Sequence, residues 1–337
     1  MPTVNGSSVL YTAYSENFSK EITMNSRPQA LTNLLKSFTQ TKLYLLFVAS
    51  SLVAFALNRH FNINLEMALL GVSVVQLGLI IALERWLPFQ TTWQAPQGDV
   101  LTDSSSAIVL VGLVDPVLKA ALPLLAIFLL STLPASNSFH PASTSLINWG
   151  AFSFWSAALI ALGWTEFAKY WAHRLHHRVK ALWWLHALHH SSGRLYWLNG
   201  FRFHPLNYAI NTGLSVLPLW LIGTPVEVML GVQAIAQPVI LLQHSNISLR
   251  SGWLKRILST NETYRAHHSK HADTANSNYG SAFLVWDHVF GTYRAAQTSL
   301  TLAEVGLFEG SQAYPATHSY WQQLRSMFSP NCCQRAS

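Results

Sequence analysis

Residues 164–190 read WTEFAKYWAHRLHHRVKALWWLHALHH and contain six histidines. His173 and His177 are four residues apart, as are His186 and His190, with His189 between them, so on a helix each set shares a face. Imidazole is the commonest metal ligand in proteins and suits zinc, copper, iron and nickel. This stretch therefore predicts two helices that each present metal ligands.

The remaining histidines strengthen that prediction. Twelve of the fifteen in the chain lie between residues 173 and 288. A third cluster, His267-His268, follows Tyr264, and His244 ends an apolar run. A lone histidine is most often a surface or interface residue, but several clusters expected on one face of a membrane are hard to explain that way. Eight or more candidate ligands exceed the needs of one ion, so the pattern indicates two metals.

The composition predicts a membrane protein. The chain has 337 residues, half of them hydrophobic and 10% of them Asp, Glu, Lys or Arg, whereas soluble domains carry about 25%. That deficit excludes a disordered chain, a coiled coil and an ordinary soluble enzyme. Apolar runs near the length that spans a bilayer cover residues 43–57, 65–83, 107–130, 146–162 and 208–242. Residues 86–105, between the second and third runs, are expected to form a polar loop.

These runs predict an all-α integral membrane bundle of four or more transmembrane helices. The last run is broken at residues 223–225 and is long enough for a hairpin. The His-rich segments would form a helical cap. The expected regions are a flexible polar leader (1–40), transmembrane helices (41–163), a catalytic domain (164–294) with a membrane hairpin (208–243), and a C-terminal tail (295–337).

The basic residues predict the orientation of the chain. Residues 164–202 and 250–294 contain six Lys or Arg each, whereas 131–143 contain none. Cytoplasmic loops carry the excess of Lys and Arg, so the His clusters are expected in the cytosol, on the same side as the N-terminus. The net charge of +7 is thereby explained by topology, and no nucleic-acid partner is expected.

Several metal chemistries fit the clusters poorly. A zinc protease of the His-Glu-x-x-His type needs a glutamate as general base, but Arg174 follows His173 and no cluster contains Glu. A metal transporter would place its ligands within the spans. A b-type haem would use only two histidines. A pair of irons that binds O2 explains the number of ligands, their neutral character and their position beside the membrane.

The motifs resemble those of the fatty acid hydroxylase/sterol desaturase superfamily, which consists of integral-membrane di-iron oxygenases. Besides the three His boxes, the resemblance rests on short motifs over residues 164–294. These are Leu182-Trp183, His-His-Ser-Ser (189–192), Arg-Phe-His-Pro (202–205), Asn278-Tyr279-Gly280 and Trp-Asp-His-Val-Phe-Gly-Thr (286–292).

The resemblance implies which residues hold the metal. The ligands expected from it are His173, His177, His186, His189, His190, His244, His267 and His268. One position departs from the family pattern, because Tyr264 stands where the third box usually begins with histidine. Tyr264 takes that place as a phenolate or as a hydrogen-bond donor, His271 replaces it, or the centre has one ligand fewer. His176, His204 and Glu166 are expected as ligands or as partners of ligands.

The implied activity is hydroxylation of a C–H bond of a fatty acyl, sterol or related lipid, with two irons, O2 and external electrons. The chemistry needs no catalytic groups beyond the metal ligands. The lipid would enter from the bilayer, and electrons would come from a cytochrome b-type protein, a ferredoxin or a reductase. Alternatives are a lipid or sterol desaturase and an alkylglycerol-type ether-lipid monooxygenase. An alternative of another class is a non-catalytic membrane metal-binding or transport protein.

Overall fold

The computed structural model shows an all-α protein, as predicted. It describes residues 7–61, 64–132, 147–295, 305–309, 311, 313–317 and 319–328. Among these residues extended backbone pairs only in three isolated bridges. The helices are α1 Ser7–Phe61, α2 Leu65–Trp86, α3 Val100–Val109, α4 Asp115–Ser131, α5 Phe154–Arg178, α6 Lys180–His190, α7 Pro205–Leu221, α8 Val226–Gln243, α9 Asn261–His267, α10 Ala272–Ala275, α11 Val285–Val289 and α12 Tyr320–Ser326.

Four helical segments of the described residues are long and apolar enough to cross a membrane. They are Gln29–Asn58, Leu65–Trp86, Val100–Ser131 and Val226–Gln243. The third is α3 and α4 joined by a π-helical turn, Leu110–Val114. Between half and nine-tenths of the residues in these segments are not buried, and many of the exposed side chains are large and apolar, as expected of helices that face lipid.

The third span begins earlier than the sequence predicts. Residues 100–105 were expected in a polar loop, but α3 starts at Val100. Its polar residues Thr102, Asp103 and Ser106 are buried. Polar groups are tolerated inside such a helix when protein partners satisfy them, and here they face the segment between α6 and α7.

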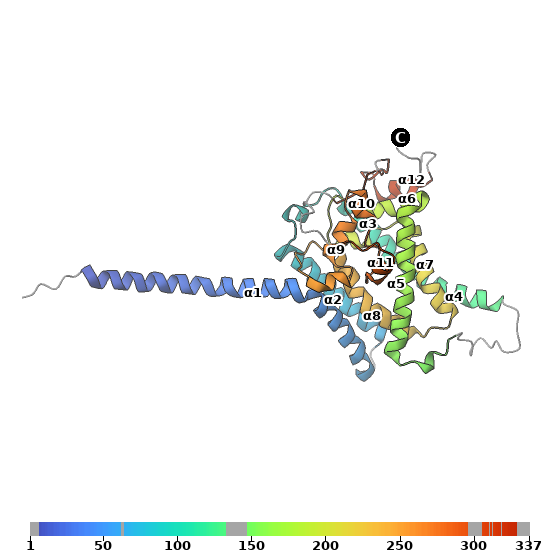
Figure 1. Cartoon of the computed structure of the whole chain (residues 1–337), viewed down its shortest axis with the longest axis horizontal. Helices are drawn as coiled ribbons and strands as arrows, with labels where there is room; N and C mark the ends of the chain where they lie inside the picture. The colour runs from blue at the N-terminus through green and yellow to red at the C-terminus, as the bar shows by residue number, and fades with distance from the viewer. Residues whose placement is uncertain are drawn as a thin grey trace, which may run out of the picture.

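The predicted flexible leader is helical in the structure from Ser7 onward. It continues into the first span as α1, which projects from the body of the molecule (Figure 1). Pro28 lies between the leader and the first span and removes one hydrogen bond from α1. Residues 7–27 contain neither Gly nor Pro. On the N-terminal side of Pro28 each further residue adds one hydrogen bond, so the polar sequence continues the helix.

The fourth and fifth apolar runs form the helices that carry the first His box and His244. The fourth run enters α5, which begins at Phe154 after the Ser153 hydroxyl caps the Ser156 N–H (3.3 Å). The fifth run is divided into α7 and α8 by a tight turn at Gly223, whose φ of 71° favours glycine. Both helices pack against α5. The main core lies between α1, α2, α5 and α8.

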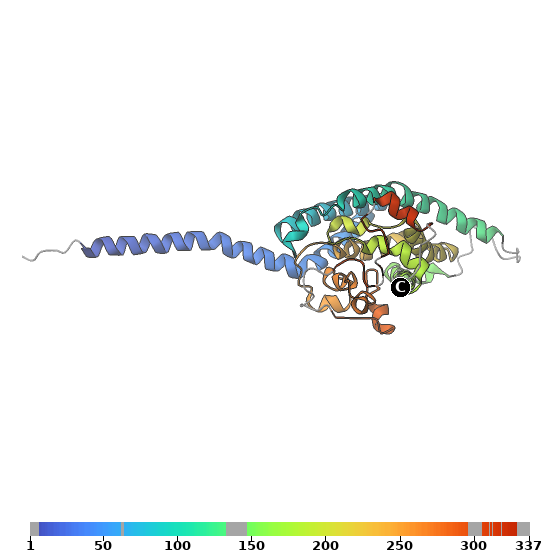
Figure 2. The same ribbon diagram turned by 90° about the horizontal axis from the view of Figure 1, so that it is seen from above.

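The C-terminal tail packs against the His-rich region instead of forming a separate segment. Tyr320 of α12 is fully buried, and the Trp184 indole N–H donates to the Ser326 hydroxyl (2.9 Å). Seen from above, α12 lies beside α3 (Figure 2). Its N-terminus carries a capping box, Ser319 with Gln322, which is the sequence signal for a helix in this tail.

Candidate metal centre

The eight histidines expected as ligands converge into two adjacent groups. Their ring nitrogens lie within 4.8 Å of one another inside each group. The first group contains His173, His177, His186, His190 and His267. The second group contains His189, His244 and His268. The two groups meet where the rings of His190 and His268 stack at 4.3 Å.

Helical spacing explains the division between the groups. On α6, His186 and His190 are one turn apart and point to the first group, whereas His189 is rotated by about 100° from His190 and enters the second. The same holds at the end of α9, where the rings of the adjacent residues His267 and His268 are perpendicular, at 90°. His244 enters the second group from the C-terminal end of α8.

Backbone carbonyls orient three of the rings. The Nδ1 atoms of His173 and His267 lie 2.8 Å from the carbonyl oxygens of Tyr279 and Ser277. Nδ1 of His189 lies 3.1 Å from the Arg202 carbonyl. A carbonyl only accepts hydrogen bonds, so each Nδ1 carries the proton and each Nε2 keeps its lone pair. This tautomer is the one that presents Nε2 to a metal.

The loop that supplies the Tyr279 carbonyl is itself held by two buried carboxylates. Asp287 accepts the N–H groups of Tyr279 (2.8 Å) and Gly280 (2.7 Å). Glu166 accepts the N–H groups of the next turn, at residues 282 and 283. A Cβ at Gly280 would lie 2.2 Å from the Phe283 carbonyl oxygen, so only glycine fits there.

Burial keeps the imidazoles neutral. Burial lowers the pKa of His267 to about 4. Burial, together with the repulsion that a protonated His267 would exert, lowers the pKa of His244 to about 3. Burial also holds the pKa of His189, His190 and His268 well below the usual value, with nearby imidazoles adding to the shift. Neutral histidine is the form that binds a metal.

The donor atoms of the first group fit a metal. Nε2 of His173, His177, His186, His190 and His267 is buried without a hydrogen-bond partner, and so is Nε2 of His268 in the second group. In that group the Nε2 atoms of His189 and His244 lie 3.2 Å apart. Buried polar atoms are otherwise almost always satisfied. Six buried, neutral and unpartnered Nε2 atoms are a donor set that divalent iron or a similar metal ion can use.

Tyr264 lies beside the second group. Its side chain is buried, and its hydroxyl lies 3.1 Å from Nε2 of His189. Its ring lies 4.7 Å from that of His244. His271, the alternative occupant, has a side chain that is 51% exposed and lies 3.9 Å from the Glu309 carboxylate. This position favours Tyr264 over His271 at the third-box position.

Three further candidates lie next to the groups without joining them. The Nδ1 of His176 bonds the Ala172 carbonyl at 2.6 Å within α5. His204 caps α7, where its Nδ1 accepts the Leu206 N–H at 3.1 Å. Glu166 binds backbone N–H groups through Oε2. Each therefore supports the elements that carry the candidate ligands.

Aromatic side chains close the site, and one of them was not expected. Phe203 stacks on the ring of His189 at 4.2 Å, and Trp183 lies 5.1 Å from that of His177. Phe308 of the C-terminal tail packs on Trp183 at 4.2 Å and stacks on His177. The sequence gives no periodicity around Phe308 that could have revealed this contact.

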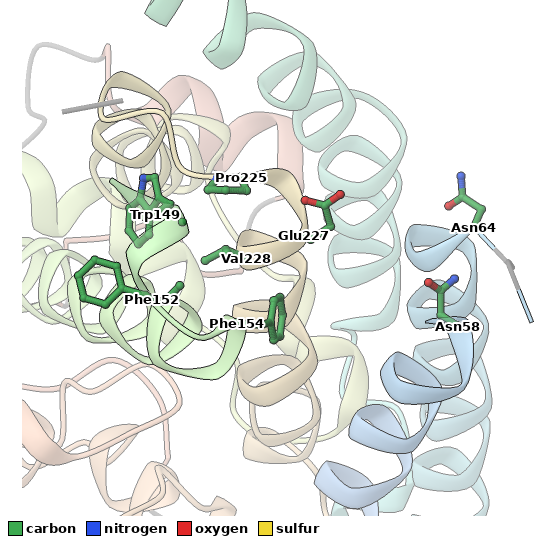
Figure 3. Close-up of a pocket in the computed structure, with 10 residues that line it drawn as sticks. Asn58, Asn64, Trp149, Phe152, Phe154, Pro225, Glu227 and Val228 are labelled. Carbon is green, nitrogen blue, oxygen red and sulfur yellow. The ribbon is translucent and has the colours of Figure 1, made fainter. Parts of the chain in front are cut away.

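A separate pocket of about 810 Å³ lies at the other end of the bundle. Trp149, Phe152, Phe154 and Glu227 line it (Figure 3). It adjoins the N-terminus of α8, whereas His244 follows its C-terminus, about 26 Å away at the rise of an α-helix. None of its lining residues belongs to either histidine group.

Comparisons with known proteins agree with the site. A sequence model described as fatty acid hydroxylase matches residues 158–292. Ornithine lipid hydroxylase OlsE of Rhizobium tropici is 35% identical over 240 residues, covering 69% of this chain and 70% of that protein. Human alkylglycerol monooxygenase is 28% identical over 160 residues, covering 44% of this chain and 32% of that protein. No solved structure matches the chain. The chain belongs to the fatty acid hydroxylase family.

Proposed function

We propose that the eight histidines bind two iron ions and that the protein hydroxylates a C–H bond of a polar, amino-acid-containing membrane lipid of the ornithine-lipid type. Membership of the family makes the protein a lipid-hydroxylating oxidoreductase of the membrane. The finer proposal rests on one observation above all: two adjacent groups of buried, neutral imidazoles whose nitrogens converge within 4.8 Å.

The iron pair would supply O2 activation and insertion of one oxygen atom into a C–H bond. The balanced reaction takes the lipid, O2, two electrons and two protons to the hydroxylated lipid and water. The residues of the chain hold and orient the centre: backbone carbonyls fix the tautomers of His173, His189 and His267, and Phe203 and Trp183 cover the rings against water.

Two features support hydroxylation over the alternatives. The relatives are named as a hydroxylase and a monooxygenase, which favours oxygen insertion over desaturation. The ornithine lipid hydroxylase aligns over 70% of its length, and the alkylglycerol monooxygenase over 32%. The first is therefore the better guide to the substrate, and an ether lipid is the second candidate. The electron donor would be a cytochrome b-type protein, a ferredoxin or a reductase.

Lipid analysis of cells with and without the protein tests this proposal. We expect a gain of one oxygen atom, +16 in mass, in the amino-acid-containing lipids, and about two irons per purified chain. Both should disappear in the double variant His189→Ala/His190→Ala. The matched control is His271→Ala, which removes an exposed histidine outside both groups.

Other outcomes would contradict the proposal in different ways. A loss of two mass units would indicate desaturation, and disappearance of an ether lipid would indicate cleavage. Zinc alone, or no metal in protein produced with ample iron, would exclude the di-iron centre.

A further inference from the structure

One buried face of α3 forms hydrogen bonds with residues 196–203, the segment that follows the second His box. Asp103 is fully buried and accepts three hydrogen bonds from that segment. The donors are the Arg202 guanidinium at 2.7 Å, the Tyr196 hydroxyl at 2.8 Å and the Asn199 amide at 3.0 Å. A buried ion pair is stable only when its remaining polar atoms are satisfied in this way.

Ser106, one turn further along α3, holds the same segment by its backbone. Its hydroxyl donates to the Phe201 carbonyl at 2.8 Å and accepts the Phe203 N–H at 3.0 Å. Ser106 is fully buried. Asp103 and Ser106 are three residues apart and therefore share one face of the helix.

The segment held by α3 touches His189 at two points. The Arg202 carbonyl accepts from Nδ1 of His189 at 3.1 Å, and the Phe203 ring stacks on the imidazole at 4.2 Å, tilted by only 16°. The Arg202 guanidinium also donates to the Leu188 carbonyl at 2.9 Å. The Arg202 carbonyl therefore sets the tautomer of His189, and the Phe203 ring sets the plane of its imidazole.

We propose that Asp103 and Ser106 are positioning residues for the second histidine group, acting on His189 through Arg202 and Phe203. The inference rests on the proposed function, because it assumes that this group binds a metal. Both residues lie outside the part of the chain that the family sequence model matches, residues 158–292. Groups that orient a metal-bound histidine through its second ring nitrogen change metal affinity by about 10- to 100-fold.

The chain offers a matched control in Asp99. Its carboxylate forms a pair with Arg194 at 2.6 Å that is also buried. The Arg194 carbonyl, however, accepts from the Ser192 hydroxyl and not from a histidine. Asp99→Asn and Asp103→Asn therefore break the same kind of ion pair. Only the arginine that pairs with Asp103, Arg202, contacts His189 through its carbonyl.

The experiment compares metal content, not activity. Asp103→Asn, Ser106→Ala, Ser106→Thr and Asp99→Asn proteins are purified with iron, and their metal-free forms are titrated with Co²⁺. We expect Asp103→Asn and Ser106→Ala to retain about half of the wild-type metal and to bind the remaining equivalent about 10- to 100-fold more weakly. Asp99→Asn and Ser106→Thr should match wild type, because the first spares His189 and the second keeps the hydroxyl.

Each result decides the proposal. Full metal content in both Asp103→Asn and Ser106→Ala, or an equal loss in Asp99→Asn, would overturn it while leaving the di-iron proposal intact. Wild-type protein that binds neither iron nor Co²⁺ would overturn both. If Asp103→Asn does not fold, as judged from thermal unfolding of the metal-free protein, Ser106→Ala against Ser106→Thr decides, because these substitutions leave the buried Asp103–Arg202 ion pair intact.

Discussion

At the scale of single residues, Tyr264 is where this chain departs from its family. Nδ1 of His189 donates to a carbonyl, so its Nε2 is an acceptor, and the Tyr264 hydroxyl, 3.1 Å away, donates to it. One lone pair cannot serve both a proton and a metal. If a metal takes Nε2, the phenol loses this partner, and its oxygen, which lies beside the rings of the second group, would be available as a further ligand.

We predict that Tyr264 is the fourth ligand of the second group. The iron(III) protein should then show a phenolate-to-iron charge-transfer absorption in visible light, and Tyr264→Phe should abolish it and weaken metal binding by about tenfold or more. Tyr264→His should restore metal binding without the absorption, because it recreates the usual third box. A visible spectrum unchanged by Tyr264→Phe would show that the phenol stays outside the coordination shell.

The depressed histidine pKa values predict how stability depends on pH. In the unfolded chain the imidazoles titrate near 6.5, whereas burial lowers the pKa of His267 to about 4 and that of His244 to about 3. Between these values the unfolded state binds more protons, so stability rises with pH. The folded state keeps this advantage above pH 6.5 and loses it as the pH falls toward 4.

Thermal unfolding of the metal-free protein in detergent checks this expectation. The midpoint should fall steadily as the pH is lowered from about 6.5 to about 4, and the slope should be shallower in the His267→Gln variant. A midpoint that is flat over this range would mean that the histidines are not neutral and buried in the metal-free protein.

At the scale of elements, local patterns predicted the helices well and their partners poorly. The four-residue spacing of His173 with His177 and of His186 with His190 predicted the helical faces that form the first group. The same spacing placed His189 with them, but the 100° turn per residue sends it to the second group. A count of angles along α6 would have shown this division from the sequence.

Long-range contacts explain the elements that were predicted wrongly. Residues 100–105 were read as a loop because of their polar side chains, but Asp103 meets Arg202, 99 residues away, and no local signal encodes that pairing. Phe308 covers His177 in the same way. Charged residues in a predicted loop next to an apolar run can thus belong to the helix when a buried partner lies elsewhere in the chain.

At the scale of the whole molecule, several of the few carboxylates share one role, which is to hold the backbone segments behind the histidines. Asp103, Asp287, Glu166 and Glu84 are buried, and none belongs to a histidine group. Asp287 and Glu166 hold the loop behind His173, and Asp103 holds the segment behind His189. Glu84 of α2 accepts the Asn246 N–H, two residues after His244, at 2.8 Å. Imidazoles thus offer the donor atoms, and carboxylates fix the backbone behind them.

The same contacts show which ends of the spans lie near the histidine groups. The C-terminus of α2, the N-terminus of α3 and the C-terminus of α8 all meet the histidine groups, while the N-termini of α2 and α8 lie at the opposite end with the pocket. The excess of Lys and Arg lies in the segments around the histidines. The positive-inside rule then predicts that the histidine end lies in the cytosol.

We predict this orientation for the protein in cells. In a chain with Cys332 and Cys333 replaced by serine, Lys270→Cys marks the histidine end and Glu66→Cys the opposite end; both positions are exposed. A membrane-impermeant maleimide should label Glu66→Cys in intact cells and Lys270→Cys only after permeabilisation. The reverse pattern would place the iron site, and any electron donor that serves it, on the outer face, because the two positions lie at opposite ends of the spans.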